Sequence, residues 1–260
     1  MERSNSYIVL FAAAVCLVCS VFVAFSVVAL KERQDANAVL DRQTKVLIVA
    51  GLVEEKAKVS APEVQALFDK WVVPRVVDLE TGHYDDSIDA STYDQQRALK
   101  DPATSKPAPE NRAGLRKVPL RALVYQVMDE GQVEKIILPI EGKGLWSTLY
   151  GFLALGPDTT SITGITFYQH GETPGLGGEV DNPSWKALWP GRRAFDDEWK
   201  PAIQVIKGRA KSAAEDPYRV DGLSGATLTA RGVNELVRYW LGEEGFGPYL
   251  ERFRSERNAA

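Results

Sequence analysis

The chain has 260 residues, of which 45% are hydrophobic and 25% charged, and its formal net charge is −4. No basic cluster interleaves with aromatic residues, so nucleic-acid binding is not expected. With only two histidines, His83 and His170, the sequence excludes a multi-histidine metal site, and no bound metal is predicted.

Residues 8–30 form an uncharged run of 23 residues. A helix of this length spans roughly 34 Å, enough to cross a bilayer with some tilt. A cleaved signal peptide is the alternative, but its apolar region is normally about 7 to 15 residues long. The run therefore predicts a transmembrane helix after a short tail, residues 1–7. Both cysteines, Cys16 and Cys19, lie inside it, so the rest of the chain can form no disulfide or metal-thiolate site.

Basic residues flank the span on both sides, with Arg3 before it and Lys31, Arg33, Arg42 and Lys45 after it. By the positive-inside rule, this count places the large domain in the cytoplasm. Acidic residues lie among the basic ones, however, and long domains can override the rule.

Helices and a first strand are expected in residues 31–80. The membrane helix continues as a polar helix to a stop near Gly51. A second helix starts at a capping box formed by Ser60 and Glu63, and Pro74 is expected to end it.

Residues 81–118 are rich in Asp, Ser, Lys and Pro, which indicates a long surface insertion without regular elements. The domain core is expected in residues 119–260. Apolar residues at 121–128 and 134–140 flank a turn and predict a β-hairpin, and 148–155 with 161–168 predict a second one. The sequence thus predicts an α+β fold, with an antiparallel sheet and flanking helices.

Three shorter elements are expected after the sheet. Asn182 caps a short helix that runs to Trp189, and residues 202–207 predict a strand. Residues 229–241 predict an amphipathic helix. Its apolar side consists of Val233, Leu236, Val237 and Trp240.

Residues 221–227, with the sequence DGLSGAT, lead into this last helix. Gly225 and Ala226 let the backbone approach a bulky group closely, and Thr227 supplies a hydroxyl. A helix N-terminus stabilises a nearby anion by roughly 0.3 to 1 kcal/mol, which would favour a phosphate on Thr227. The alternative is an ordinary turn, because Ser, Gly and Thr are common at helix starts.

Two glycine-rich loops precede this motif, residues 142–151 (GKGLWSTLYG) and residues 170–180 (HGETPGLGGEV). Loops of this composition suit the close approach of a flat ligand, but each is equally typical of a turn between strands. Taken alone, Trp146 is more typical of a core tryptophan, and Lys207 is at least as typical of a solvated lysine.

Together, the DGLSGAT motif and the two loops resemble the FMN-binding domain found in the C subunit of the sodium-translocating NADH:quinone oxidoreductases. The resemblance covers most of the chain and is weakest at residues 81–118. It implies FMN attached covalently through a phosphodiester bond to Thr227. The phosphate-side turn would then be formed by Ser224, Gly225 and Ala226.

The resemblance also implies further cofactor-binding residues. Those expected to line the flavin ring or the ribityl chain are Trp146, Thr173, Leu176 and Gly177. His170 and Glu172 match the family's loop and are expected beside the flavin, while Lys207 would offset the phosphate charge. No catalytic residue is expected in this chain.

By the same resemblance, the chain is an electron-carrying subunit, not catalytic alone, of a membrane complex that couples electron transfer from NADH to quinone with sodium export. The implied partners are the membrane subunits B, D and E, the subunits A and F, and a separate flavin transferase that uses FAD. That transferase works outside the cytoplasm in the family. The resemblance therefore implies a bacterial inner-membrane protein with a periplasmic domain, against the charge count.

Two alternatives remain open. The G subunit of the related ferredoxin:NAD oxidoreductase complex shares the TPGLG and SGAT elements. A membrane-tethered flavin-binding sensor without a redox role would keep the same fold.

Overall fold

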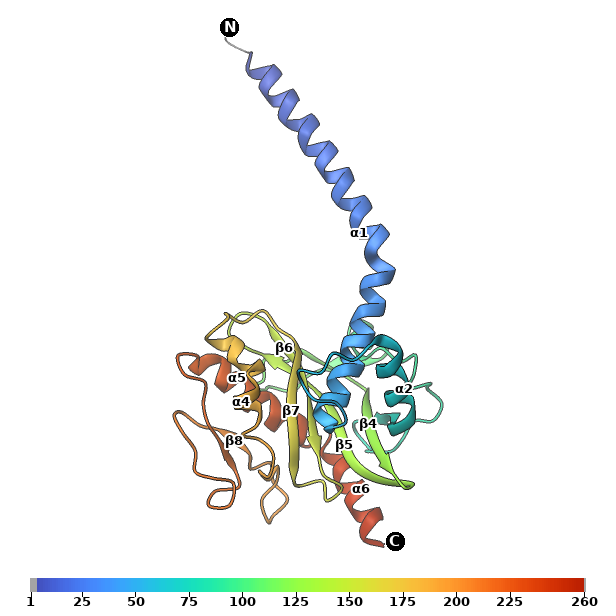
Figure 1. Cartoon of the computed structure of the whole chain (residues 1–260), viewed down its shortest axis with the longest axis vertical. Helices are drawn as coiled ribbons and strands as arrows, with labels where there is room; N and C mark the ends of the chain where they lie inside the picture. Colours follow the sequence, from blue (N-terminus) through green and yellow to red (C-terminus); the bar gives the residue numbers. More distant parts are fainter. Residues whose placement is uncertain (1–3, 260) are drawn as a thin grey trace. The chain divides into compact units, whose positions relative to one another are not determined.

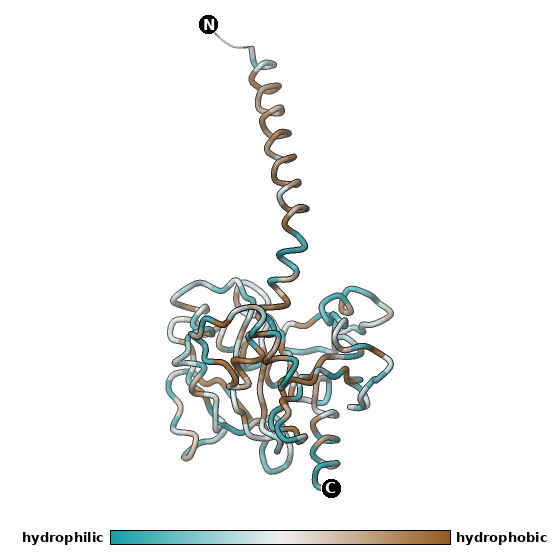
Figure 2. Tube along the Cα trace, turned by 45° about the vertical axis from the view of Figure 1, so that its right-hand side comes forward, coloured by the Kyte–Doolittle hydropathy of each residue, from teal (hydrophilic) through white to brown (hydrophobic). Residues whose placement is uncertain are grey.

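The structure is a computed structural model that describes residues 4–259, and it divides into two units, Met1–Arg42 and Gln43–Ala260. The first unit is formed by the α1 helix, Asn5–Ala50, which continues into the second. Among the described residues, α1 is the one helix long and apolar enough to cross a membrane. Figure 2 shows its hydrophobic stretch giving way to hydrophilic residues. The predicted tail, residues 1–7, is helical from Asn5 onward, and residues 1–3 lie outside the described part.

The last turns of α1 belong to the second unit. The helix ends at Ala50 as predicted, and Gly51 follows with a positive φ of 75°. Lys135 caps this end, because its Nζ donates to the carbonyl of Ala50 at 2.6 Å. The buried residues of these turns are Val46, Leu47, Val49 and Ala50. The final turns of α1 are therefore part of the core of the second unit.

A five-stranded antiparallel sheet in the order β1-β4-β5-β6-β7 forms the centre of the second unit (Figure 1). Its strands are β1 (Val72–Asp78), β4 (Arg121–Asp129), β5 (Gln132–Lys143), β6 (Thr148–Leu155) and β7 (Ile162–Gln169). Both predicted hairpins are confirmed. The first turns through Glu130 and Gly131, which both have positive φ, as a tight two-residue hairpin turn requires.

Helices cover both faces of this sheet. On one face, α5 (Thr227–Leu241) packs against β5, and α6 (Gly247–Ala259) joins the same core. On the other face lies α2 (Ala61–Trp71), whose Phe68 ring is centred 6.0 Å from the ring of Tyr125 on β4. The predicted capping box of α2 is confirmed, since Glu63 accepts from the Ser60 N–H at 2.9 Å.

Three local predictions were wrong. The α2 helix ends at Trp71, and Pro74 lies in β1, an edge strand, where proline is tolerated. The predicted strand at residues 202–207 shrinks to β8 (Gln204–Val205), because its parallel partner β9 (Arg219–Val220) is equally short. The helix capped by Asn182 is only α4 (Pro183–Lys186), so it ends before Trp189.

Residues 81–118 contain regular structure that the sequence did not predict. They include α3 (Gln95–Ala98) and β2 (Ser105–Pro107), which pairs with β3 (Lys117–Pro119). Ala113 and Val118 are buried. The segment therefore contributes to the core, although much of it is exposed.

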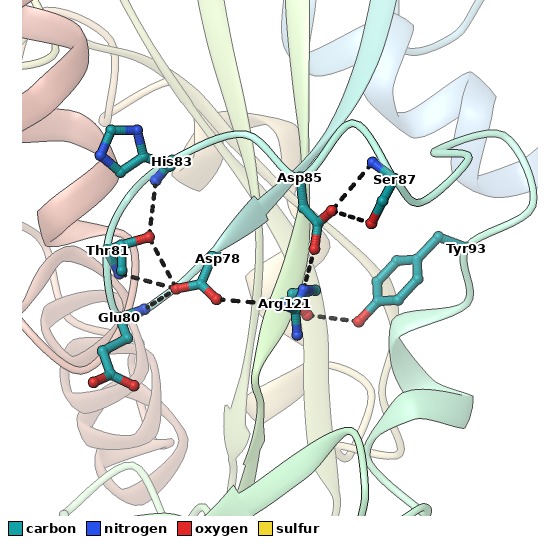
Figure 3. Close-up of polar contacts among 8 residues, drawn as sticks. All are labelled: Asp78, Glu80, Thr81, His83, Asp85, Ser87, Tyr93 and Arg121. Carbon is teal, nitrogen blue, oxygen red and sulfur yellow. Dashed lines mark hydrogen bonds and ion pairs between the residues drawn. The ribbon is translucent and has the colours of Figure 1, made fainter.

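Arg121 at the start of β4 anchors this segment to the sheet, as Figure 3 shows. Its guanidinium pairs with Asp85 and, at 3.9 Å, with Asp78. The Tyr93 hydroxyl donates to the carbonyl of Arg121 at 2.6 Å. Hydrogen bonds from Ser87 and from Arg121 lower the pKa of the Asp85 carboxyl group. One arginine thus ties two points of the segment, Asp85 and Tyr93, to the sheet, and it also pairs with Asp78 at the end of β1.

Candidate functional site

Thr227 is the first residue of α5, two positions earlier than the predicted helix start. The preceding residue, Ala226, caps the helix without a side-chain hydrogen bond, and the first turn contains no acidic residue. The Thr227 side chain is exposed, and Gly225 adopts a φ of +72°, which suits glycine. Backbone N–H groups at such a helix end favour an anion.

Two cavities are lined by residues at the start of α5. The first has a volume of about 340 Å³ and is lined by Thr227, Lys207, Gly222, Leu223, Arg231 and Asn234, among others. The second has a volume of about 200 Å³ and is lined by Leu145, Trp146, Glu172, Thr173, Leu176, Gly177, Gly225, Ala226 and Thr229. Consecutive residues, Ala226 and Thr227, therefore line different cavities.

The structure brings most of the predicted site residues to these cavities. Thr227 and Lys207 share the first cavity. The predicted ring-lining residues share the second, together with Glu172. Ser224 is exposed in the turn outside both linings, and His170 lies outside both as well.

Sequence reasoning missed Arg231, Leu145 and Thr229. A signal for Arg231 was available, since it follows Thr227 by four residues and so lies one helical turn further along the same side. Its side chain adds a second cation to the cavity that holds Thr227 and Lys207.

Trp146 is 71% exposed, so the interpretation as a core tryptophan is wrong. Leu145 and Leu176 beside it are 41% and 45% exposed, and Leu228, next to Thr227, is 53% exposed. These four side chains form an apolar rim at the second cavity and the start of α5. Large apolar side chains exposed together are typical of a binding site.

The carboxylate of Glu172 is buried at the second cavity. It accepts from the N–H groups of Leu145, Trp146 and Ser147 at 3.2, 2.9 and 3.2 Å. The Thr229 hydroxyl donates to it at 2.6 Å. Burial alone would raise the pKa of Glu172, but the Thr229 hydroxyl and the three amides outweigh burial, and the pKa lies below its ordinary value.

His170 holds the backbone of this glutamate. Its Nδ1 accepts from the Glu172 N–H at 3.2 Å, so its Nε2 carries the proton and donates to Asp181 at 2.8 Å. Asp181 ends the short 3-10 helix η1 (Gly177–Asp181). The loop that precedes η1 is therefore tied to it by a histidine bridge.

These features fit the FMN that the resemblance implies. The uncapped helix end, Lys207 and Arg231 suit a phosphate, and the apolar side chains of the rim suit a flat aromatic ring. Space beside the ring-lining residues is kept by Gly177, where a Cβ atom would lie 2.7 Å from Oε2 of Glu172. Among the described residues, no group of three or more His, Cys, Asp or Glu side chains could hold a metal ion.

Residues 144–242 match the family model of the FMN-binding domain. The C subunit of the Na(+)-translocating NADH-quinone reductase from Pseudomonas aeruginosa is 48% identical to this chain over 256 residues, which cover 97% of both chains. The corresponding C subunit from Vibrio anguillarum is 46% identical over 243 residues, covering 93% of this chain and 92% of that relative.

Solved structures give the same result. NqrC from Shewanella oneidensis superimposes with a TM-score of 0.75 at 36% identity, covering 82% of this chain and 96% of that one. The C subunit of the Na(+)-translocating NADH-quinone reductase from Parabacteroides distasonis gives a TM-score of 0.66 at 26% identity, covering 85% and 96%. The α+β fold and the resemblance are confirmed, and this chain belongs to the NqrC family, the C subunits of the Na(+)-translocating NADH-quinone reductases.

Proposed function

We propose that this chain is the electron-carrying subunit of a sodium-exporting NADH:quinone reductase, and that it holds FMN covalently by a phosphodiester bond to Thr227. One observation supports this most: the exposed Thr227 residue lies at an uncapped helix start and lines a cavity with Lys207 and Arg231, while the preceding residues, Gly225 and Ala226, line a cavity with apolar walls. Among the residues that the structure describes, Glu235 is the one acidic residue in the lining of the first cavity. Membership of the NqrC family supports the same function. When bound, FMN supplies the redox chemistry, accepting and releasing electrons.

The residues of the chain bind and orient this cofactor. The first-turn amides of α5, with Lys207 and Arg231, stabilise the negative charge of the phosphodiester. Trp146, Thr173, Leu176 and Gly177 would line the ring or the ribityl chain. Gly225 and Ala226, which line the same cavity, would form the turn beside the phosphate, with Ser224 exposed in that turn outside the cavity. In this arrangement the protein contributes position and charge, and it needs no catalytic group of its own.

The proposed partners are the other subunits of the complex, above all the membrane subunits B, D and E, together with a flavin transferase that attaches FMN from FAD. The attachment site supports the need for an enzyme, because Thr227 is an ordinary exposed hydroxyl. Since such a transferase acts outside the cytoplasm, we place the domain on the periplasmic side of the inner membrane.

Intact-mass measurement of the full chain purified from its native host tests the attachment. The wild-type chain is expected to carry the mass of one phosphodiester-linked FMN and to fluoresce in a denaturing gel. Thr227→Ala is expected to lose both signals while staying folded, because alanine is well tolerated at an exposed helical position. Ser255→Ala is the matched control, since it removes an exposed hydroxyl from a helix outside both cavities and should keep the flavin. Covalent flavin on the Thr227→Ala chain would show that the acceptor is another residue. A wild-type chain without flavin would favour a tethered module without a redox role.

A further inference from the structure

Glu172 has a role distinct from contacting the flavin. Four donors surround its carboxylate: the hydroxyl of Thr229 and the amides of residues 145–147. Oε2 accepts from Leu145 and Thr229, while Oε1 accepts from Trp146 and Ser147. A side chain that is 5% exposed and engaged in this way has little capacity left for a ligand.

These bonds join the three segments that line the second cavity. Residues 144–147 form the loop between β5 and β6, Glu172 belongs to the loop after β7, and Thr229 lies in the first turn of α5. The amides of Leu145, Trp146 and Ser147 have no other protein acceptor among the described hydrogen bonds. One carboxylate therefore binds all three amides of the loop that bears Trp146, and the Gly171 N–H adds a bond to the Ser147 hydroxyl at 2.6 Å.

Two glycines leave the space that this arrangement needs. A Cβ atom on Gly144 would lie 2.6 Å from Oε1 of Glu172. A Cβ atom on Gly177 would lie 2.6 Å from the Thr229 hydroxyl and 2.7 Å from Oε2 of Glu172. Real side chains do not approach this closely, so glycine at both positions lets the carboxylate enter. The glycines of the two loops thus leave space for the buried Glu172 side chain as well as for a ligand.

We propose that Glu172, with Thr229, is a positioning residue that fixes the 144–147 loop at the edge of the flavin cavity, so that Trp146 stands at the rim without being held by contacts of its own side chain. This inference rests on the proposed function for its consequence on the flavin. Its structural part is independent of any cofactor.

Hydrogen exchange of the three loop amides measures this role directly. The experiment uses the full chain in the Thr227→Ala background, which carries no covalent flavin under the proposed function. Glu172→Gln is expected to speed exchange at least tenfold at one or more of residues 145–147, because its carboxamide keeps one acceptor oxygen and turns a donor group toward the amides that bonded the other. Thr229→Val, which removes only the hydroxyl, is expected to have a smaller effect, and Thr229→Ser is expected to restore protection. Glu179→Gln is the control, since it lies in η1 and keeps an acceptor for Asn182.

Core amides of β5 should keep their protection in every variant. Unchanged exchange at residues 145–147 would overturn the proposal, because it would mean that Glu172 does not hold the loop. An equal acceleration at these residues and in β5 would also overturn it, because it would mean only a general loss of stability.

In the chain with Thr227 intact, Glu172→Gln should still receive FMN but shift the visible absorption and the midpoint potential of the flavin. An unshifted flavin would leave Glu172 without influence on the cofactor and contradict the second half of the proposal. A chain that never binds flavin would sink the proposed function but leave the exchange result standing.

Discussion

Glu141 lies on β5 with 7% of its surface exposed, and burial raises the pKa of its carboxyl group from 4.5 to about 7. Between these pH values the folded chain holds a proton that the unfolded chain releases. The stability contributed by this group is therefore complete below pH 4.5 and is lost as the pH rises through about 7. The loss amounts to roughly 3 kcal/mol.

Glu141→Gln is expected to remove this pH dependence. The amide keeps the shape of the side chain and never ionises, so the variant should match the parent near pH 5 and exceed it in stability near pH 8. Urea unfolding of both proteins at the two pH values gives the comparison. The pKa of Glu172 is shifted in the opposite direction, so its contribution changes only below pH 4.5 and does not interfere. Parallel pH profiles for parent and variant would mean that Glu141 is charged in the folded chain.

The DGLSGAT motif that ends at Thr227 could be identified from the sequence because it is short and local, and it leads into a helix as predicted. Trp146 could not be placed in the same way, since a tryptophan is buried in most sites and the bonds that hold its loop come from a glutamate 26 residues later. His170 and Glu172 were recognised as loop residues, but their hydrogen bonds depend on the folded positions of three loops. At the residue scale, a short motif could be identified from the sequence, but hydrogen-bond partners far apart in the sequence could not.

Two glycines set the contact between α5 and the sheet. A Cβ atom on Gly142 of β5 would lie 2.5 Å from Cβ of Leu236, and one on Gly232 of α5 would lie 2.4 Å from the carbonyl oxygen of Lys143. Each element therefore has a glycine where the other approaches. This close packing positions the helix whose first residue is Thr227.

Gly232→Ala is expected to destabilise the domain by about 1 to 3 kcal/mol, because the new methyl group meets backbone that cannot rotate away. The gain in helix propensity, up to about 1 kcal/mol, offsets only part of this cost. Thermal unfolding measures the difference. Arg231→Ala, an exposed neighbour in the same helix, should change stability by less than about 0.5 kcal/mol. A variant as stable as the parent would show that α5 can move away from β5 freely.

The elements that could be predicted are those with a clear period. The α5 helix buries Val233, Leu236, Val237 and Trp240 as expected, and the strands β4 to β7 alternate or cluster apolar residues. The α6 helix was missed because its sequence is rich in charge and buries only Tyr249 and Leu250. The structure in residues 81–118 was missed because its elements are only three or four residues long and because contacts distant in sequence, such as Arg121 with Asp85 and Tyr93, hold the segment against the sheet.

At the scale of the whole molecule, the side of the membrane on which the domain lies is a proposal that conflicts with the charge count. The apolar span has a single basic residue before it and four in the polar stretch after it. Orientation rules based on charge weaken when a long folded domain follows the span. Under the proposed function the flavin transferase gives the stronger argument, because the domain would have to meet that enzyme outside the cytoplasm.

A reporter fused after Ala260 tests this orientation. Alkaline phosphatase, which is active only after export, is expected to be active in the fusion, and a green fluorescent protein at the same place is expected to remain dark. The same phosphatase fusion on a chain without residues 8–30 should be inactive, which controls for leakage. If the green fluorescent protein fusion were fluorescent and the phosphatase fusion inactive, the domain would lie in the cytoplasm, as the charge count indicates.

The α1 helix determines where its membrane-spanning part can be removed or replaced by another anchor. Its apolar part belongs to the first unit, yet Val46 and Leu47 are 1% and 0% exposed, and Lys135 closes its last turn. A soluble or differently anchored version must therefore keep the helix from Gln43 onward. A junction placed after Ala50, at the helix end, would remove hydrophobic side chains that the sheet needs as cover. The anchor is therefore best cut or replaced within the α1 helix, before Gln43, and not at the end of the helix.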